Sequence, residues 1–162
     1  MKHPFDILPL SSGQLIFTPC PGTKDASLHD SLAQLKAAGA AALITLMPAQ
    51  ELTQNNADNI GTICTEQGLA WFQLPIEDDC APEHAFEQAF STNKAAILAL
   101  LHNGQTVAIH CKGGSGRTGL MAAILMTELG YSKTDATAQV QRLRPKALCH
   151  PVHQAYFAAF NG

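Results

Sequence analysis

The chain of 162 residues has the length of one domain, and its 46% hydrophobic and 14% charged residues exclude a disordered protein. A formal net charge of −3 argues against a large electrostatic footprint for nucleic acid or an anionic membrane. The five cysteines, an odd number without a C-x-x-C pair, exclude a disulfide framework. We therefore expect a single cytoplasmic domain over residues 1–162, without a signal sequence or a membrane span.

Short apolar runs alternate with longer amphipathic ones along the whole chain. In chain order we expect a strand at 15–17, a helix at 27–38, a strand at 42–46, a polar turn at 50–56, a helix at 58–67 and a strand at 70–74. The second half continues with a loop at 75–82, a helix at 83–102, a strand at 106–109, and helices at 118–129, 132–143 and 152–160. This alternation predicts a three-layer α/β/α fold around a mainly parallel sheet of about four to five strands. Ligands should bind beyond the carboxyl ends of those strands, where the loops at 75–82 and 110–117 fall.

The most informative segment is the glycine-rich run that follows the strand at 106–109. It reads His-Cys-Lys-Gly-Gly-Ser-Gly-Arg-Thr-Gly over residues 110–119. Unpaired N–H groups at a helix start favour negative charge, and glycines keep side chains out of a concave turn. The planar fork of Arg117 can hold two oxygens of a tetrahedral oxyanion. The segment therefore predicts a phosphate cradle, formed by Lys112, Gly113, Gly114, Ser115, Gly116 and Arg117, with the Cys111 thiolate as nucleophile below it.

Two other interpretations of this segment explain less. The glycines at 114, 116 and 119 formally fit a dinucleotide fingerprint. However, little more than one βα unit could follow, and the acidic residue expected about 20 positions later is absent. Alternatively, Cys111 is simply a buried core cysteine. Neither alternative gives Arg117 a function.

The pattern Cys111-(five residues)-Arg117, preceded by His110 and followed by Thr118-Gly119, resembles the signature loop of the cysteine-dependent protein tyrosine phosphatases. The short chain is more similar to the dual-specificity branch, and within it to the kinase-associated phosphatase group. Weaker similarities extend upstream to residues 75–78 and downstream to residues 144–145 and 153–156. The resemblance implies hydrolysis of phosphotyrosine, and of phosphoserine and phosphothreonine, through a phosphocysteine intermediate, with no metal and no cofactor.

The resemblance also implies a general acid in the loop at 75–82. By its position in Pro-Ile-x-Asp, Asp78 matches the family's acid, which protonates the leaving oxygen and later activates water. Burial near the thiolate would keep a carboxyl group protonated near neutral pH. Asp79 is the main alternative acid, and the three adjacent carboxylates could also form a solvated turn.

Several other residues have supporting or open roles. Thr118 matches a hydroxyl that donates to the departing thiolate, and His110 matches the histidine that supports the loop, although a neutral core histidine is an equal alternative. Lys112 either attracts an anionic substrate or is only solvated. Cys80 could form a protective disulfide with an oxidised Cys111. Gln154 matches a late glutamine of the family, to which we assign no catalytic role.

A further set of observations limits the substrate and the cofactors. The run Cys149-His150-x-x-His153 hints at a metal, but Pro151 interrupts it and no fourth ligand is evident, so we expect none. The tryptophan-proline-aspartate triplet of longer tyrosine phosphatases is absent, and so is the long N-terminal element that deepens their pocket. We therefore expect a shallower pocket that admits phosphoserine and phosphothreonine as well as phosphotyrosine. With one lysine in the loop, an inositol headgroup would be under-neutralised.

We therefore expect a monomer that acts on a phosphoprotein or phosphopeptide, without nucleic acid or membrane partners. A phosphoinositide or RNA 5′-phosphate phosphatase that uses the same loop, a phosphate-binding module without turnover and a sulfurtransferase remain alternatives.

Overall fold

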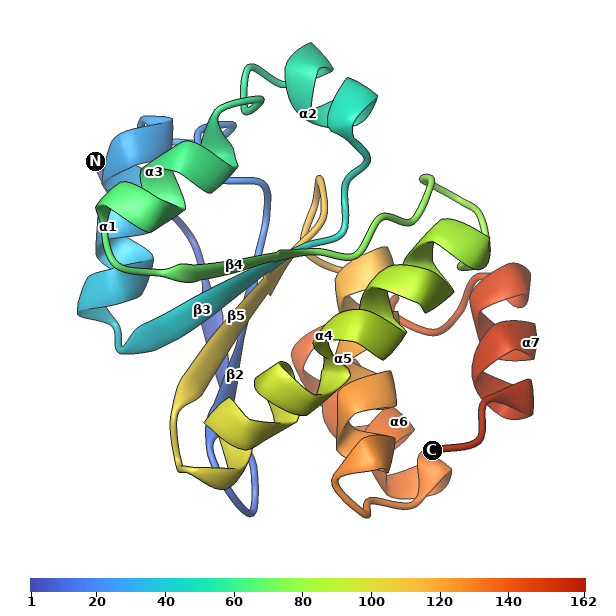
Figure 1. The fold of residues 1–162 in the computed structure, drawn as a ribbon. Helices are drawn as coiled ribbons and strands as arrows, with labels where there is room; N and C mark the ends of the chain where they lie inside the picture. Colours follow the sequence, from blue (N-terminus) through green and yellow to red (C-terminus); the bar gives the residue numbers. More distant parts are fainter.

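Five strands form one sheet in the order β1-β2-β5-β3-β4 in the computed structural model, which describes residues 1–162 (Figure 1). They are β1 (Asp6–Pro9), β2 (Gln14–Thr18), β3 (Ala40–Thr45), β4 (Ala70–Gln73) and β5 (Thr106–His110). β1 is antiparallel to β2, and the other neighbours are parallel, which confirms a mainly parallel sheet. The sequence did not predict β1, a four-residue edge strand that is mostly exposed and therefore lacks an apolar run.

The chain has seven helices, and all but α2 cover the two faces of the sheet. They are α1 (Leu28–Ala37), α2 (Ala49–Gln54), α3 (Ile60–Glu66), α4 (His84–His102), α5 (Gly116–Glu128), α6 (Lys133–Leu143) and α7 (Pro151–Ala159). In Figure 1, α1 and α3 lie on one side of the sheet and α4 to α7 on the other. None of the helices combines the length and the apolar character that a membrane crossing would need.

The side chains of the central strands divide between two apolar cores. On β2, Leu15 and Phe17 belong to the larger core under α4 to α7, whereas Ile16 belongs to the smaller core under α1 and α3. Val107 and Ala108 of β5 divide in the same way. Because helices cover both faces, these strands read as continuous apolar runs rather than alternating ones.

Helix α2 occupies most of the segment for which the sequence predicted a polar turn at 50–56, so that prediction was wrong. The helix is six residues long, begins after Pro48 and buries only Leu52, so it carries no apolar periodicity. Helix α5 begins at Gly116, two residues earlier than predicted, inside the glycine-rich segment. Both differences concern residues that border the site described below.

The carboxyl ends of the four parallel strands are in register. Thr18 and Thr45 are both paired with His110, and Gln73 is paired with Thr45. The loops that follow β3, β4 and β5 therefore begin at one edge of the sheet, as expected for a ligand site in a parallel α/β fold.

Candidate active site

The segment between β5 and α5 forms the predicted concave loop. Gly114 has φ +81°, a left-handed conformation that favours glycine. A Cβ atom at Gly114 would also lie 2.6 Å from the carbonyl carbon of Thr18, at the end of β2. The loop can therefore lie against the end of β2 only because residue 114 has no side chain.

The Cys111 thiol lies at the floor of this loop and is only 4% exposed. Its Sγ accepts two hydrogen bonds, from the Gly114 N–H and from the Thr118 hydroxyl, each 3.2 Å long. Two hydrogen-bond donors thus point at the sulfur, which also lies near the N-terminus of α5. This geometry fits the roles predicted for Cys111 and Thr118, but it places Gly114 behind the sulfur rather than on the wall of the cavity above it.

His110 is fully buried behind the loop, at the end of a chain of hydrogen bonds. Its Nδ1 lies 3.1 Å from the Cys111 carbonyl oxygen, which can only accept, so Nδ1 carries the proton. Burial lowers the pKa of His110 to about 4, so the ring is neutral and Nε2 accepts from the Thr45 hydroxyl at 2.8 Å. Thr45 in turn accepts from Trp71 Nε1 at 2.8 Å. The buried neutral histidine thus supports the loop, and the sequence reasoning missed the roles of Thr45 and Trp71.

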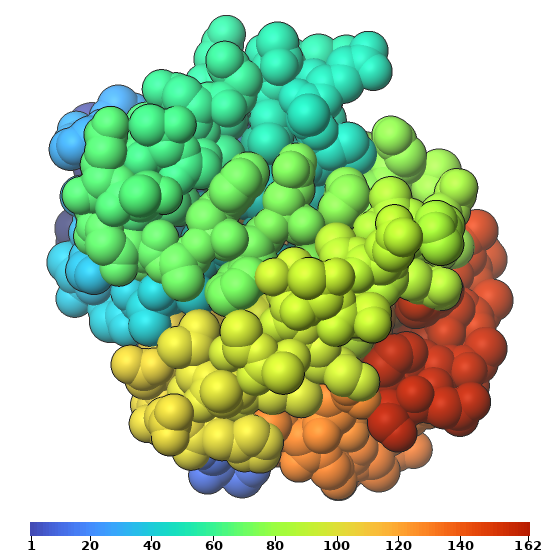
Figure 2. All heavy atoms as spheres, in the orientation of Figure 1, coloured from blue at the N-terminus to red at the C-terminus, as the bar shows by residue number.

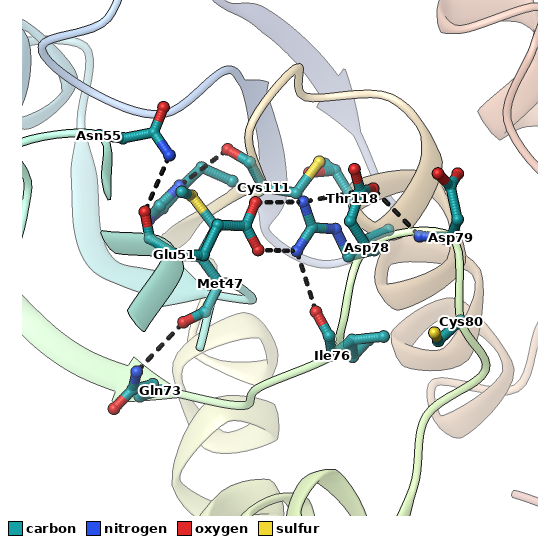
Figure 3. A network of polar contacts seen from close by, with 12 residues as sticks. Met47, Glu51, Asn55, Gln73, Ile76, Asp78, Asp79, Cys80, Cys111 and Thr118 are labelled. Atoms are coloured by element: carbon teal, nitrogen blue, oxygen red, sulfur yellow. Dashed lines mark hydrogen bonds and ion pairs between the residues drawn. The ribbon is translucent and has the colours of Figure 1, made fainter. Parts of the chain in front are cut away.

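Arg117 is held by a carboxylate that the sequence analysis did not identify. The two oxygens of Glu51, on α2, accept from Nη1 and Nη2 at 2.7 and 2.8 Å (Figure 3). Nη1 also donates to the Ile76 carbonyl at 2.9 Å. Burial lowers the pKa of Arg117, but the hydrogen bonds to Glu51 and the charges of Cys111 and Glu51 outweigh this effect and raise it.

The contacts of Arg117 leave part of its guanidinium available to an anion. Of five N–H donors on an arginine, Glu51 uses two and Ile76 uses one. The Nε–H and one Nη2–H make no hydrogen bond and point to the same side of the planar group, with Asp78 Oδ1 3.5 Å from Nη2. Arg117 can therefore hold two phosphate oxygens while Glu51 fixes its orientation.

The loop after β4 brings Asp78 and Asp79 to the mouth of the site. Asp78 Oδ1 lies 3.5 Å from Nη2 of Arg117 and accepts from the Asp79 N–H at 3.1 Å. Asp79 instead lies 3.9 Å from His150 Nε2 and has φ +59°. This geometry favours Asp78 over Asp79 as the acid. The expected burial is wrong, however, because the Asp78 side chain is 63% exposed.

A cavity of about 630 Å³ opens above the thiol. The predicted residues Asp78, Cys111, Lys112, Gly113, Ser115, Gly116 and Arg117 line it, together with Thr23, Lys24, Asn55, Asp79, Lys146, His150 and His153. In Figure 2, α2 stands out from the body of the molecule beside the green loop that follows β4. Elements from five parts of the chain thus converge on one polar cavity.

Of the other residues singled out in the sequence, His153 lines this cavity and Gln154 does not. His153 Nε2 lies 3.1 Å from the carbonyl oxygen of Cys80. Because a carbonyl only accepts, the Nε2–H of His153 donates this hydrogen bond. Gln154 lies at a separate depression between α6 and α7, away from the site. Cys80 and Cys111 are both free thiols, so the protective disulfide stays a prediction.

The chain is similar to known proteins in sequence and in structure. Residues 20–130 match the family model described as "Polymorphic toxin system, DSP-PTPase phosphatase". The chain is 30% identical over 110 residues to a putative tyrosine phosphatase, 197R, of Invertebrate iridescent virus 6, covering 65% of this chain and 41% of that protein. The chain therefore spans less than half the length of this curated relative.

Solved structures share the fold. A crystal structure of kinase associated phosphatase, with its catalytic site cysteine replaced by serine, superposes with a TM-score of 0.85 at 22% identity and covers 99% of both chains. A crystal structure of PTPMT1 in complex with PI(5)P superposes with a TM-score of 0.64 at 18% identity, covering 88% of this chain and 86% of that one.

Proposed function

We propose a phosphatase activity for this chain, because it belongs to the DSP-PTPase phosphatase family of polymorphic toxin systems and thereby to the dual-specificity type of cysteine-dependent protein tyrosine phosphatases. The proposed substrates are phosphoproteins with phosphotyrosine and with phosphoserine or phosphothreonine. The reaction proceeds in two steps through a phosphocysteine, and the five free cysteines suit work in a reducing cytoplasm.

In the first step, the Cys111 thiolate attacks phosphorus and an S–P bond forms as the P–O bond to the substrate breaks. Asp78 gives its proton to the leaving oxygen. The free N–H groups of Arg117 and of the loop at 112–117 stabilise the charge on the equatorial oxygens.

In the second step, water attacks the phosphocysteine and its proton passes to Asp78. The S–P bond breaks, inorganic phosphate leaves and the thiolate is restored. The N–H of Gly114 and the hydroxyl of Thr118 stabilise the departing sulfur, because both lie 3.2 Å from Sγ before the reaction begins.

One observation carries this proposal above the others: a buried sulfur with two donors and an arginine with two unused donors line the same cavity. A phosphate-binding module without turnover would need the arginine but not the sulfur donors. A thiolate below a bound phosphate is the arrangement that covalent phosphoryl transfer requires.

The test is hydrolysis of an aryl phosphate under reducing conditions by the purified chain and by Cys111→Ser. We expect the variant to lose turnover and to keep binding of inorganic phosphate or vanadate. Cys149→Ser is the matched control, because Cys149 is an exposed free thiol outside the cavity lining, and it should retain full activity. Turnover by Cys111→Ser would overturn the mechanism. Phosphate binding without any turnover by the unmodified chain would instead identify a binding module.

A further inference from the structure

The cavity above Cys111 is larger than a single phosphate needs. Its volume of about 630 Å³ falls in the range of pockets that hold whole small ligands, about 300–1,000 Å³. Beyond the phosphate cradle, its wall is completed by Lys24 from the loop between β2 and α1 and by Lys146 from the loop between α6 and α7. Of the three lysines that line this cavity, only Lys112 lies in the glycine-rich segment at 110–119.

These lysines have no carboxylate partners. The ammonium groups of Lys24, Lys112 and Lys146 make no ion pair within 4.0 Å, whereas Asp78 pairs with Arg117 and Asp79 with His150. Lys112 belongs to the loop that is proposed to bind the scissile phosphate, and it also lines an adjacent depression with Glu51 and Glu77. Lys24 and Lys146 are the cations that remain once the scissile phosphate has been bound by Arg117 and the loop N–H groups.

The lining offers very little apolar surface. Cys111 is the only hydrophobic residue among the 14 that line the cavity, and the only aromatic rings in the lining are the polar imidazoles of His150 and His153. Recognition beyond the scissile phosphate must therefore rest on charge and hydrogen bonds rather than on burial of apolar area.

Resting on the proposed phosphatase function, we propose that Lys24 and Lys146 form a subsite for a second anionic group of a phosphopeptide. This group is the phosphate or carboxylate of a residue near the scissile phosphoester. Both lysines are exposed at the rim of the cavity rather than at its floor, which suits a peptide that lies across the mouth. The preferred substrates are then phosphopeptides with an acidic or a second phosphorylated residue nearby.

The experiment compares three phosphoserine peptides that differ in one neighbouring residue: alanine, glutamate or phosphoserine. The expected kcat/KM of the unmodified chain is about fivefold to tenfold higher for the doubly phosphorylated peptide than for the alanine peptide at low salt. This preference should act through KM and shrink at high salt, as exposed charge interactions do. In Lys24→Ala/Lys146→Ala the ratio should fall to about one. The matched control, Lys2→Ala/Lys36→Ala, removes two exposed lysines outside the cavity and should keep the preference.

The possible failures can be distinguished from one another. If an aryl phosphate is hydrolysed but the three peptides are used equally, the subsite proposal is wrong and the phosphatase function stands. If a free inositol bisphosphate is preferred to every peptide and the lysine variant loses that preference, the peptide assignment is overturned. If no phosphomonoester is hydrolysed at all, the proposed function itself fails.

Discussion

The carboxylate of Glu51 meets the guanidinium of Arg117 in a two-point contact of 2.7 and 2.8 Å, across 66 residues of sequence. Both side chains are shielded from water, at 16% and 2% exposure. Because this contact uses the end of the guanidinium, it leaves the edge with Nε free for a phosphate. Glu51 is thus a positioning residue that acts through Arg117.

Glu51→Gln should lower kcat/KM for an aryl phosphate by about 10- to 100-fold, or about 1.4–2.7 kcal/mol of transition-state stabilisation. The amide keeps one acceptor but loses the second and the negative charge, so Arg117 is held less firmly. Steady-state kinetics and the inhibition constant of vanadate measure this effect.

The control for that variant is Glu77→Gln, which changes an exposed carboxylate in the same region that makes no hydrogen bond or ion pair. It should behave as the unmodified chain does. Equal kinetics for Glu51→Gln and Glu77→Gln would show that Arg117 needs no carboxylate to hold its orientation.

The contrast between Glu51 and Cys111 explains how far the sequence could predict this site. Cys111, Arg117 and Thr118 lie within eight consecutive residues, so their spacing and glycines predicted the loop directly. Glu51 lies on a six-residue helix with a single buried residue, which has too little apolar pattern to predict. Its role depends on a contact between distant segments, which leaves no local signal.

The difference between local patterns and contacts of distant segments also explains what could be predicted of the rest of the fold and the site. The parallel strands and long helices were predicted because helices cover both faces of the sheet, which makes the strands continuously apolar. Lys24 and Lys146 were missed as cavity residues because only the folded chain brings their loops together.

Asp78→Asn should reduce kcat by about 10²- to 10⁴-fold, the usual contribution of a general acid. The loss should be larger for a phosphoserine peptide than for an aryl phosphate, because an alkoxide leaves less readily than a phenolate without protonation. Kinetics on both substrates across a pH series measure this effect.

Asp79→Asn is the matched variant, since Asp79 lies next in the chain and faces His150 rather than Arg117. It should keep most of the activity. If Asp79→Asn shows the larger loss and the steeper dependence on the leaving group, the acid has been assigned to the wrong carboxylate.

Gly119→Ala should destabilise the fold by about 1–3 kcal/mol, as overpacking a tight contact does. A Cβ atom at residue 119 would lie 2.4 Å from Ala147 Cβ and 3.2 Å from Val140 Cγ1. The free energy of unfolding in urea measures the effect. The double variant Gly119→Ala/Ala147→Gly should recover part of the lost stability relative to the sum of the single variants. Strict additivity would argue that the two residues do not press on each other.

The free energy of unfolding should fall at low pH because His110 is buried in its neutral form. Burial lowers the pKa of this histidine from 6.5 to about 4. Below pH 6.5 the unfolded chain therefore binds a proton that the folded chain does not, and the free energy of unfolding falls as the pH falls from 6.5 to 4. The expected loss from His110 is about 2 kcal/mol between pH 8 and pH 5, and burial lowers the pKa of His3 and His153 in the same direction.

Urea unfolding at pH 8, 6.5, 6, 5.5 and 5 tests this expectation above the range where ordinary carboxylates titrate. His110→Asn should flatten the curve. His153→Gln gives a second measurement with a smaller effect if the first variant does not fold. His29→Gln, which removes an exposed histidine, is the matched control. A free energy of unfolding that stays constant over this range would contradict a neutral buried histidine at residue 110.

Arg144 links the edge strand β1 to the glycine-rich loop at Gly114. It donates to the Asp6 carboxylate at 2.7 Å and to the Gly114 carbonyl at 3.0 Å, and it lies over the Phe17 ring. The outermost strand is therefore mechanically coupled to the peptide groups that surround the nucleophile. Detachment of β1, by a nick or a bulky fusion near the start of the chain, will loosen the Gly114 peptide and weaken the sulfur's amide donor, although more than 100 positions separate Asp6 from Gly114 in the sequence.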